Sequence, residues 1–537
     1  MKKKLFTSVV AVVLAAVLAV PAFAGVGPGY TGGQTVKKEE TSQSAENTAA
    51  ETAAGSTVST GKQSAPAALT AAGNGPVSAD PVLGQIPDVH VQFKTGDGNL
   101  TDGFVSGGGW FNSPLDGFCG LKIRLEYSIG DVSYRAYTEE HGWTRWAMNS
   151  MDTDWFNDAA KITAVQIRMK GHTSNLFDVY YQAKLNDGTT TGWAKNGQSC
   201  GTIGTGKYIQ QMQFKLWKKG VPLNENMNKR LIAAGEEGIV FNSDGRASYS
   251  KADGSLYTGW AYDTGGDKYY FIDNQPVTGW QEIDGFRYYF DDCCHLVTDL
   301  ESVLGDPGGY MAKVNKDMKT MTIYARDDAG KYTIPYKVFL CTIGSATPIG
   351  EFKLFERYNW KFMHDDIYVQ YLQRYKNPGF CIHSIIYYPT EGSYMLRANS
   401  YNELGKNKSD GCIRLKSGDC AWFYSHLSTG SVVQIYSDEW STGPFDRPCI
   451  EQAIPLAQNW DPTDPVVIND LANHTGPFTE GEVTVAYPDT FVNTLLAHGD
   501  YDLALTAGRA SGMELPENIE ELAAQRAAER EEAEKKD

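Results

Sequence analysis

Two stretches of this chain carry its chemistry: Ser409-Asp410-Gly411-Cys412-Ile413-Arg414-Leu415 and, upstream of it, Phe380-Cys381-Ile382-His383-Ser384. A cysteine attacks only as the thiolate, and a nearby histidine can take its proton while an arginine and backbone N–H groups favour the anion. A glycine directly before the cysteine suits a tight turn whose N–H groups could form an oxyanion hole. The pattern predicts Cys412 as a nucleophile and His383 as its general base. Pattern alone leaves open that both residues are ordinary packing and polar groups.

Other cysteines and histidines compete for these roles. Cys381 lies two positions before the candidate base and would share its strand face, while Cys341 and Cys420 sit in apolar surroundings that suit packing. His364 and His426 have no motif partner. We expect none of these five residues to act in catalysis.

The region around the two stretches, residues 310–437, is predicted to be mostly β. Strand-like runs recur in it at Met311 to Val314, Met321 to Ala325, Tyr336 to Ile343 and Val432 to Tyr436. Four motifs in order make this region resemble the L,D-transpeptidase catalytic domain of the YkuD type: Gly344-Ser-Ala-Thr-Pro-Ile-Gly-Glu-Phe352, Phe380 to Ser384, Tyr401-Asn-Glu-Leu-Gly405 and Ser409 to Leu415.

The resemblance implies a role for each site residue. Cys412 would be the nucleophile, His383 the base and Arg414 a positioning residue. Gly411 would form part of the oxyanion site with the nucleophile, and Ser384 would orient the ring of the base.

Two departures from the family pattern affect these expectations. Asp410 stands where the family usually has histidine, and a neighbouring carboxylate should disfavour the thiolate. The base and the nucleophile are 29 positions apart, which is long for the family. We expect residues Tyr387 to Asn407 to be an inserted surface loop that accounts for the length.

The resemblance implies acyl transfer between stem peptides of peptidoglycan. The thiolate would attack the carbonyl of the third stem residue, release the terminal D-Ala and pass the acyl group to an amine of a second stem, giving a 3-3 crosslink. No metal and no organic cofactor is expected, because nucleophile, base and oxyanion donors suffice for an amide. Two alternatives stay open: an L,D-carboxypeptidase with water as acceptor, and a non-catalytic wall-binding surface protein.

Upstream, residues 86–219 contain an internal repeat of about 45 residues. In each of three units an aromatic residue lies 19 positions before an apolar position of a strand-like segment, the pairs being Phe104 with Ile123, Trp146 with Val165 and Trp193 with Met212. The Gly-Trp pairs and closing strands resemble clostridial hydrophobic-tryptophan repeats. The alternative is that these tryptophans are simply core residues.

A second repeat, with a tryptophan spacing of 20, occupies residues 235–300. Thr258-Gly-Trp260 recurs as Thr278-Gly-Trp280, and Lys268-Tyr-Tyr-Phe271 recurs as Arg287-Tyr-Tyr-Phe290. Each unit predicts a short hairpin, and stacked hairpins form a solenoid. The units resemble choline-binding or glucan-binding wall repeats, which implies that Trp260, Tyr270, Trp280 and Tyr289 bind choline-bearing or glycan wall polymers. A rigid spacer is the alternative.

The N-terminus predicts export. Three lysines, a largely apolar stretch and Ala22-Phe23-Ala24 read as a signal peptide over residues 1–24. Residues 25–85 are nearly free of aromatics and are predicted to be a disordered linker. With no later apolar span, we expect a secreted protein associated with a Gram-positive-type cell wall and without a membrane span after cleavage.

Composition excludes some partners and describes the C-terminal part. A net charge of -17 disfavours nucleic acid as a partner. The nine cysteines show neither the density of a disulfide scaffold nor a zinc pattern, so the disulfide pattern stays open. Residues 438–465 form a Pro-rich extension, and 466–537 an acidic C-terminal region ending in a solvated helix or disordered tail. The whole chain is therefore predicted to be mostly β and multidomain, with β repeat modules, a β-hairpin solenoid and a β-rich catalytic domain.

Overall fold

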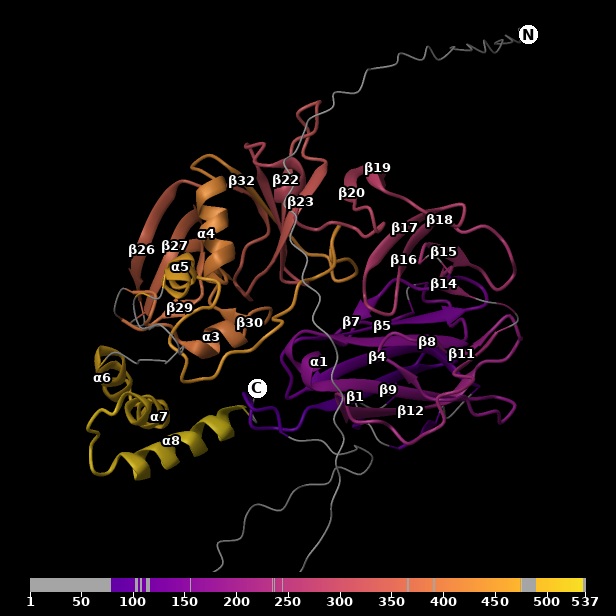
Figure 1. Ribbon diagram of the computed structural model, residues 1–537, viewed down its shortest axis with the longest axis horizontal. Coiled ribbons are helices and arrows are strands. Elements are labelled where there is room, and N and C mark those ends of the chain that lie inside the picture. Colours follow the sequence, from indigo (N-terminus) through magenta and orange to yellow (C-terminus); the bar gives the residue numbers. More distant parts are fainter. Residues whose placement is uncertain are drawn as a thin grey trace, which may run out of the picture. The chain divides into compact units, whose positions relative to one another are not determined.

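The computed structural model describes residues 79–101, 105–106, 109–112, 116–154, 156–233, 235, 237–243, 245–364, 367–389, 392–473, 475 and 489–534 (Figure 1). They all belong to one structural unit, Leu69–Asp537. The predicted signal peptide and most of the predicted linker lie outside the described residues and stay predictions. Among the helices of the described ranges, none is long and apolar enough to cross a membrane. Strands dominate these ranges, which confirms the predicted mostly β, multidomain architecture.

The first part of the described chain folds into three sheets around a single apolar core. Their strand orders are β2-β1-β4, β10-β9-β12-β3 and β13-β11-β8-β5-β6, with β7 also paired to β5. The strands are β1 (Asp88–Thr95), β2 (Val105–Ser106), β3 (Phe111–Asn112), β4 (Phe118–Glu126), β5 (Asp131–Thr138), β6 (Gly142–Trp143), β7 (Ala147–Met148), β8 (Ala164–Lys170), β9 (Phe177–Leu185), β10 (Ala194–Lys195), β11 (Cys200–Ile203), β12 (Ile209–Lys218) and β13 (Leu231–Ala233), and the short helix α1 (His172–Leu176) precedes β9.

The 45-residue repeat corresponds to one long antiparallel strand pair, present three times as β1–β4, β5–β8 and β9–β12. The three aligned apolar positions, Ile123, Val165 and Met212, are all buried in the shared core. Trp193 is also buried, as a core tryptophan would be, whereas Trp146 is half-buried and lies beneath the guanidinium of Arg168 at 4.1 Å. Phe104 of the first unit lies outside the described residues. The likeness to hydrophobic-tryptophan repeats stays a prediction.

The 20-residue repeat forms short hairpins, as predicted. These are β14 (Gly238–Phe241) with β15 (Ala247–Ser250), β16 (Gly259–Tyr262) with β17 (Lys268–Ile272) and β18 (Gln275–Pro276), and β19 (Gly279–Ile283) with β20 (Phe286–Phe290). Trp260 lies opposite Tyr270 and Trp280 opposite Tyr289, so each tryptophan faces its tyrosine across a hairpin. Their ring centroids are 5.1 and 5.2 Å apart in edge-on geometry, which stabilises each hairpin.

The region around the candidate nucleophile contains two five-stranded sheets. One has the order β23-β22-β21-β32-β25, and the other β26-β27-β28-β31 with β29 beside β27. The strands are β21 (Met311–Asn315), β22 (Thr320–Ala325), β23 (Ile334–Leu340), β25 (Gly350–Lys353), β26 (Glu356–Met363), β27 (Ile367–Lys376), β28 (Phe380–Ser384), β29 (Ile386–Tyr387), β31 (Ile413–Leu415) and β32 (Val432–Tyr436), and a separate pair joins β24 (Ile343–Gly344) to β30 (Asn407–Ser409). Three of the four predicted strand runs are present within one residue of their expected bounds, and the run predicted from Tyr336 to Ile343 is divided between β23 and β24.

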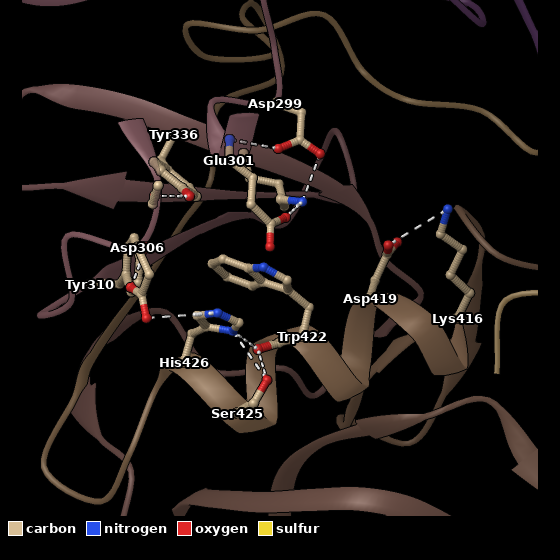
Figure 2. Close-up of polar contacts among 12 residues, drawn as sticks. Asp299, Glu301, Asp306, Tyr310, Tyr336, Lys416, Asp419, Trp422, Ser425 and His426 are labelled. Atoms are coloured by element: carbon tan, nitrogen blue, oxygen red, sulfur yellow. Dashed lines mark hydrogen bonds and ion pairs between the residues drawn. The ribbon is translucent and has the colours of Figure 1, made fainter. Parts of the chain in front are cut away.

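Helix α4 (Ser417–His426) covers this core and carries an aromatic and charged cluster, shown in Figure 2. The ring of His426 stacks on Trp422 with centroids 4.1 Å apart, and its Nδ1 contacts the carbonyl oxygen of Trp422 at 2.8 Å. The Nζ of Lys337 lies over the ring of Trp422. The same Nζ is 2.7 Å from Asp299 and 2.8 Å from Glu301. His426 therefore closes the helix C-terminus, in agreement with its predicted structural role.

The prediction of a surface loop over residues 387–407 is wrong. This segment contains the short helix α3 (Ala398–Asn402), and Met395, Leu396 and Tyr401 are buried in an apolar cluster. Phe491 and Leu495 of helix α6 (Asp489–Ala497) belong to the same cluster. The insertion is a packed part of the fold, because its apolar side chains pack against a helix from the C-terminal region.

The C-terminal region is helical. It contains α5 (Pro465–Asn473), α6, α7 (Tyr501–Ser511) and α8 (Ile519–Glu534), while a four-residue helix α2 (Glu301–Leu304) precedes β21. The extension before α5 is anchored by Arg447, whose guanidinium pairs with buried Asp131 of β5 and donates to the carbonyl oxygens of Met318 and Gly405 at 2.7 and 2.8 Å. The extension therefore joins β5 to the two-sheet region.

Candidate active site

Parallel pairing of β28 with β31 brings the two motif stretches together. Ile382 lies opposite Ile413, His383 opposite Arg414 and Ser384 opposite Leu415. Continuing this register by one residue places Cys381 beside Cys412. Alternate residues of a strand share a face, so the histidine, both cysteines and the arginine project to the same side of the sheet.

His383 is held in the tautomer that a general base requires. Its Nδ1 lies 2.6 Å from the carbonyl oxygen of Ser384, and a carbonyl oxygen can only accept, so Nδ1 carries the hydrogen. Nε2 is then left with its lone pair, and His383 is one of the neighbours that lower the pKa of Cys412. The ring is almost fully buried. Ser384 thus orients the base through its carbonyl group, while its hydroxyl accepts from the N–H of Gln370 and donates to the carbonyl of Ile385.

Cys412 combines partial exposure with an environment that favours the thiolate. Its Sγ lies 3.6 Å from the carbonyl oxygen of Gly379, and the residue is half-buried. Neighbouring Cys381 is the largest influence that lowers the pKa of Cys412; burial opposes it, and His383 reinforces it. The net direction is well below the ordinary thiol pKa. This sulfur can therefore attack an acyl carbon near neutral pH.

The turn before the nucleophile depends on glycine. Gly411 has φ +146°, and a Cβ there would lie 2.7 Å from the ring of Phe380. The earlier motif supports the same turn: a Cβ on Gly344 would lie 2.0 Å from the carbonyl oxygen of Ser409. Thr347 joins the two segments, since its hydroxyl accepts from the N–H of Gly344 at 3.0 Å and donates to the carbonyl of Gly411 at 3.0 Å.

The predicted oxyanion site involves a residue that sequence analysis missed. Ser409 accepts the N–H of Gly411 at 3.3 Å and donates to the carbonyl of Cys412 at 2.6 Å. The Gly411 N–H is thus held by a long hydrogen bond to a hydroxyl, and a substrate oxyanion would have to replace that hydroxyl. The oxyanion role of Gly411 stays a prediction. Ser409 is the first residue of the quoted stretch Ser409 to Leu415, and this position was the only sign in the sequence that it belongs to the site.

Arg414 and Asp410 differ in their relation to the nucleophile. The Arg414 guanidinium donates to the carbonyl of Lys408 at 2.8 Å. Burial lowers the pKa of Arg414, and the thiolate of Cys412 is the first of the charges that oppose this lowering. This is the placement expected of a positioning residue. Asp410 is exposed. The largest influences on the pKa of Cys412 come from Cys381, burial and His383, and the carboxylate of Asp410 is not among them.

The other cysteines and histidines considered for catalysis lie buried in the core or at the surface. Burial raises the pKa of Cys341 to about 12 and that of Cys420 well above its usual range, so both stay protonated. His364 is exposed. Cys381 is buried, yet it is the neighbour of the nucleophile, a relation the sequence did not reveal. All nine cysteines lie in the described ranges, and each is a free thiol.

The four predicted wall-binding aromatics lie apart from this site and are half-buried within their hairpins. The Nζ of Lys268 lies 4.7 Å from the ring of Trp260, and the guanidinium of Arg287 lies 4.9 Å from that of Trp280. A quaternary ammonium would have to displace these cations to reach the ring faces. A cavity of about 1390 Å³ is lined by Trp260, Lys268 and Arg168 among others and does not include Cys412. Ligand binding by the repeats stays a prediction.

Comparison with known families supports the interpretation of the two motif stretches. The YkuD family model, described as the L,D-transpeptidase catalytic domain, matches residues 309–435. These residues form an L,D-transpeptidase-type catalytic domain. No curated protein sequence matches the chain.

Solved structures with local similarity include proteins of the same description. An L,D-transpeptidase from Stackebrandtia nassauensis is 22% identical over 24% of this chain and 56% of its own, with a TM-score of 0.18. An L,D-transpeptidase from Mycobacterium smegmatis is 16% identical over 32% of this chain and 89% of its own, with a TM-score of 0.20. A fused Zn-dependent amidase/peptidase/peptidoglycan-binding domain-containing protein from Clostridium acetobutylicum is 19% identical over 24% of this chain and 52% of its own, with a TM-score of 0.18. This chain thus spans about half the length of the first and the last of these structures.

Proposed function

We propose that this protein is a peptidoglycan L,D-transpeptidase that forms 3-3 crosslinks through a thioester on Cys412. The observation that carries the proposal is the pairing of β28 with β31, which sets Cys412 and His383 on the same side of the sheet, with the Nδ1 of the base hydrogen bonded to a carbonyl and its Nε2 left to take a proton. The family match over residues 309–435 supports the substrate class.

The first half-reaction is acylation of the cysteine. The sulfur of Cys412 attacks the carbonyl carbon of the third stem residue, and the bond to the nitrogen of the terminal D-Ala breaks. His383 holds the thiol proton and delivers it to that nitrogen, so D-Ala leaves as the free amino acid. A thioester between the third residue and Cys412 remains.

The second half-reaction returns the enzyme to its starting state. A side-chain amine of another stem attacks the thioester, His383 takes the proton of that amine, and the C–S bond breaks to restore the thiolate. The product joins two third-position residues. No step in this scheme calls for a metal or an organic cofactor, because a nucleophile, a base and oxyanion donors suffice for acyl transfer.

The repeats and the N-terminus extend the proposal to location. We propose that the signal peptide exports the chain and that the repeat regions hold it at the cell wall, with residues 235–300 binding choline-bearing or glycan polymers. The alternative for residues 235–300 is a rigid spacer. Residues 235–300 share buried contacts with the rest of the chain, such as that of Tyr262 with Asp446 at 2.7 Å, so binding should be measured with the full mature chain.

Product analysis tests the proposed reaction. The purified chain is incubated with disaccharide-tetrapeptide wall fragments, and the products are separated and weighed by mass spectrometry. We expect dimers joined between third residues together with free D-Ala, and neither from the Cys412→Ala variant. Tripeptide without dimer would assign the chain as an L,D-carboxypeptidase. Absence of any product from the unaltered chain would support the non-catalytic alternative and contradict the proposal.

A further inference from the structure

A second thiol lies beside the proposed nucleophile and has no place in the reaction described so far. Cys381 of β28 precedes the pair Ile382–Ile413 by one residue, which puts it level with Cys412 at the start of β31. Neighbouring strands of a sheet lie about 4.8 Å apart, and side chains level with each other project to the same side.

Their surroundings place the two sulfur atoms close together. The thiol of Cys381 lies 3.4 Å from the carbonyl oxygen of Gly379, and that of Cys412 lies 3.6 Å from the same oxygen. Both side chains contact one small apolar cluster that includes Val369 and Leu372. Cys381 is fully buried in it, whereas Cys412 lies at its edge and reaches solvent.

We propose that Cys381 is a positioning residue of the active site: its thiol donates a hydrogen bond to the sulfur of Cys412 and so favours the thiolate form of the nucleophile. The inference rests on the proposed function in taking Cys412 as the nucleophile. It gives a role to Cys381, for which the resemblance to L,D-transpeptidases implied none.

Burial assigns the donor and acceptor roles. The hydrogen bond with Cys412 and burial, in that order, raise the pKa of Cys381, so this thiol keeps its hydrogen. When Cys412 loses its proton to His383, its sulfur becomes a strong acceptor. The Cys381 thiol can then turn from the carbonyl of Gly379 to the thiolate, and the backbone N–H of Cys381 supports the same sulfur.

Other groups around the nucleophile act in different ways. His383 on β28 and Arg414 on β31 favour the anion, while Tyr375 of β27 stays neutral because burial raises its pKa. Asp410 is exposed in the turn. Arg374, which is paired with Cys381 in the sheet, has its Nε 3.0 Å from the carboxylate of Glu356. The opposite charges of Arg374 and Glu356 nearly cancel in their effect on the nucleophile. Cys381 is therefore the neutral donor of the group.

A purely structural thiol would behave differently from a donor. If Cys381 only fills space, a side chain of similar volume would leave the titration of Cys412 unchanged. If it donates, removal of the donor should raise the pKa of Cys412, and a hydroxyl should partly replace it. Cys381→Val and Cys381→Ala remove the donor, and Cys381→Ser retains one. Cys420→Ala is the matched control, since Cys420 is a buried thiol in the same domain on helix α4.

The rate of alkylation of Cys412 by iodoacetamide, measured from pH 2 to pH 10 on the full chain with peptide mapping, tests the proposal without relying on enzymatic activity. We expect the midpoint of the rate profile to rise by about one pH unit or more in Cys381→Val and Cys381→Ala, which corresponds to about a tenfold loss of rate below the midpoint. Cys381→Ser should lie between these and the unaltered chain, and Cys420→Ala should match the unaltered chain.

The same profiles can overturn the inference. Midpoints of a folded Val or Ala variant that coincide with that of the unaltered chain would show that Cys381 is packing only. A Ser variant that shifts as far as Val would also contradict the donor role. Because alkylation needs no peptidoglycan, loss of the transpeptidase assignment would leave this result standing, and failure of the titration shift would leave the assignment standing.

Discussion

Replacing Thr347 by valine removes a hydroxyl that connects the two halves of the active site. The hydroxyl is buried, accepts from the N–H of Gly344 at 3.0 Å and donates to the carbonyl of Gly411 at 3.0 Å, directly before the nucleophile. Valine has nearly the same shape, so the change removes hydrogen bonds without opening a cavity. We expect the turn that carries Cys412 to lose its fixed position.

The magnitude follows from what each partner loses. The carbonyl of Gly411 keeps a longer hydrogen bond from the hydroxyl of Tyr375 at 3.4 Å. Losing the hydrogen bond from Thr347 therefore costs this carbonyl about 0.5–1.5 kcal/mol of stability. The buried N–H of Gly344 is left unpaired, at about 1–3 kcal/mol. The two losses together destabilise the turn by roughly 2–4 kcal/mol. Part of this free energy displaces Cys412 and slows acylation, by about tenfold for each 1.4 kcal/mol. We expect a loss of about ten- to a hundredfold in rate and a lower unfolding midpoint.

Acylation by a carbapenem, followed by intact mass, measures this effect on the full chain. A thiolate can open the strained lactam, so the second-order rate constant reports the state of Cys412. Thr320→Val is the control: Thr320 is buried in β22, and its hydroxyl lies 3.5 Å from the carbonyl of Thr442. The control should lose stability but not rate. If Thr347→Val acylates as fast as the control, Thr347 does not hold the turn and the reasoning is wrong.

Four further outcomes are expected. Carbapenem adducts should map to Cys412 and vanish in Cys412→Ala; an adduct on another cysteine would name a different nucleophile. Hydrogen peroxide should convert Cys412 and Cys381 into a disulfide, with two thiols and one peroxide giving one disulfide and two waters, and a reductant should restore acylation; peptide mapping without such a bond would contradict their adjacency. Burial raises the pKa of Asp419 above its ordinary 3.8 to about 6, so the folded state favours the protonated form and loses stability as pH rises between these values. Asp419→Asn should remove this loss and stabilise the protein at pH 7 by on the order of 1–2 kcal/mol, since its side chain is partly exposed, with thermal unfolding at pH 4 and pH 7 as the measurement. Arg447→Met should lower stability by about 3–5 kcal/mol by leaving the carboxylate of Asp131 buried and unpaired, and adding Asp131→Asn should recover part of it in the same melts; a single variant as stable as the unaltered chain would show that the pair contributes nothing.

The fold class could be predicted from local sequence, and the same local patterns carry the proposed reacting groups. The strand runs near Met311 and Val432 follow from alternating or continuous apolar residues, and they formed within one or two residues of the expected bounds. The hairpins of the 20-residue repeat also formed, because strand and turn signals lie within a few residues of each other. Short-range patterns of this kind do not depend on distant parts of the chain.

Segments whose structure depends on distant partners were predicted less well. Residues 387–407 were expected to be an inserted surface loop because the separation of base and nucleophile is long for the family, yet Leu396 and Tyr401 are buried. Their cluster is completed by Phe491, almost a hundred residues further along the chain. A one-dimensional pattern gives no indication of which distant helix will cover a segment.

The sequence by itself determined the proposal about the chemistry of this protein: Cys412 preceded by glycine and a histidine on an upstream strand predict a thiol nucleophile and its base at the level of residue type and order. Tertiary structure alone decided how these groups are supported. Strand register is not encoded in spacing, so only the pairing of β28 with β31 revealed that Cys381 is level with the nucleophile. Likewise the hydrogen bond from Thr347 to Gly411 joins residues 64 positions apart. Side chains determine which reactions are available, whereas pKa and position depend on neighbours that folding brings together.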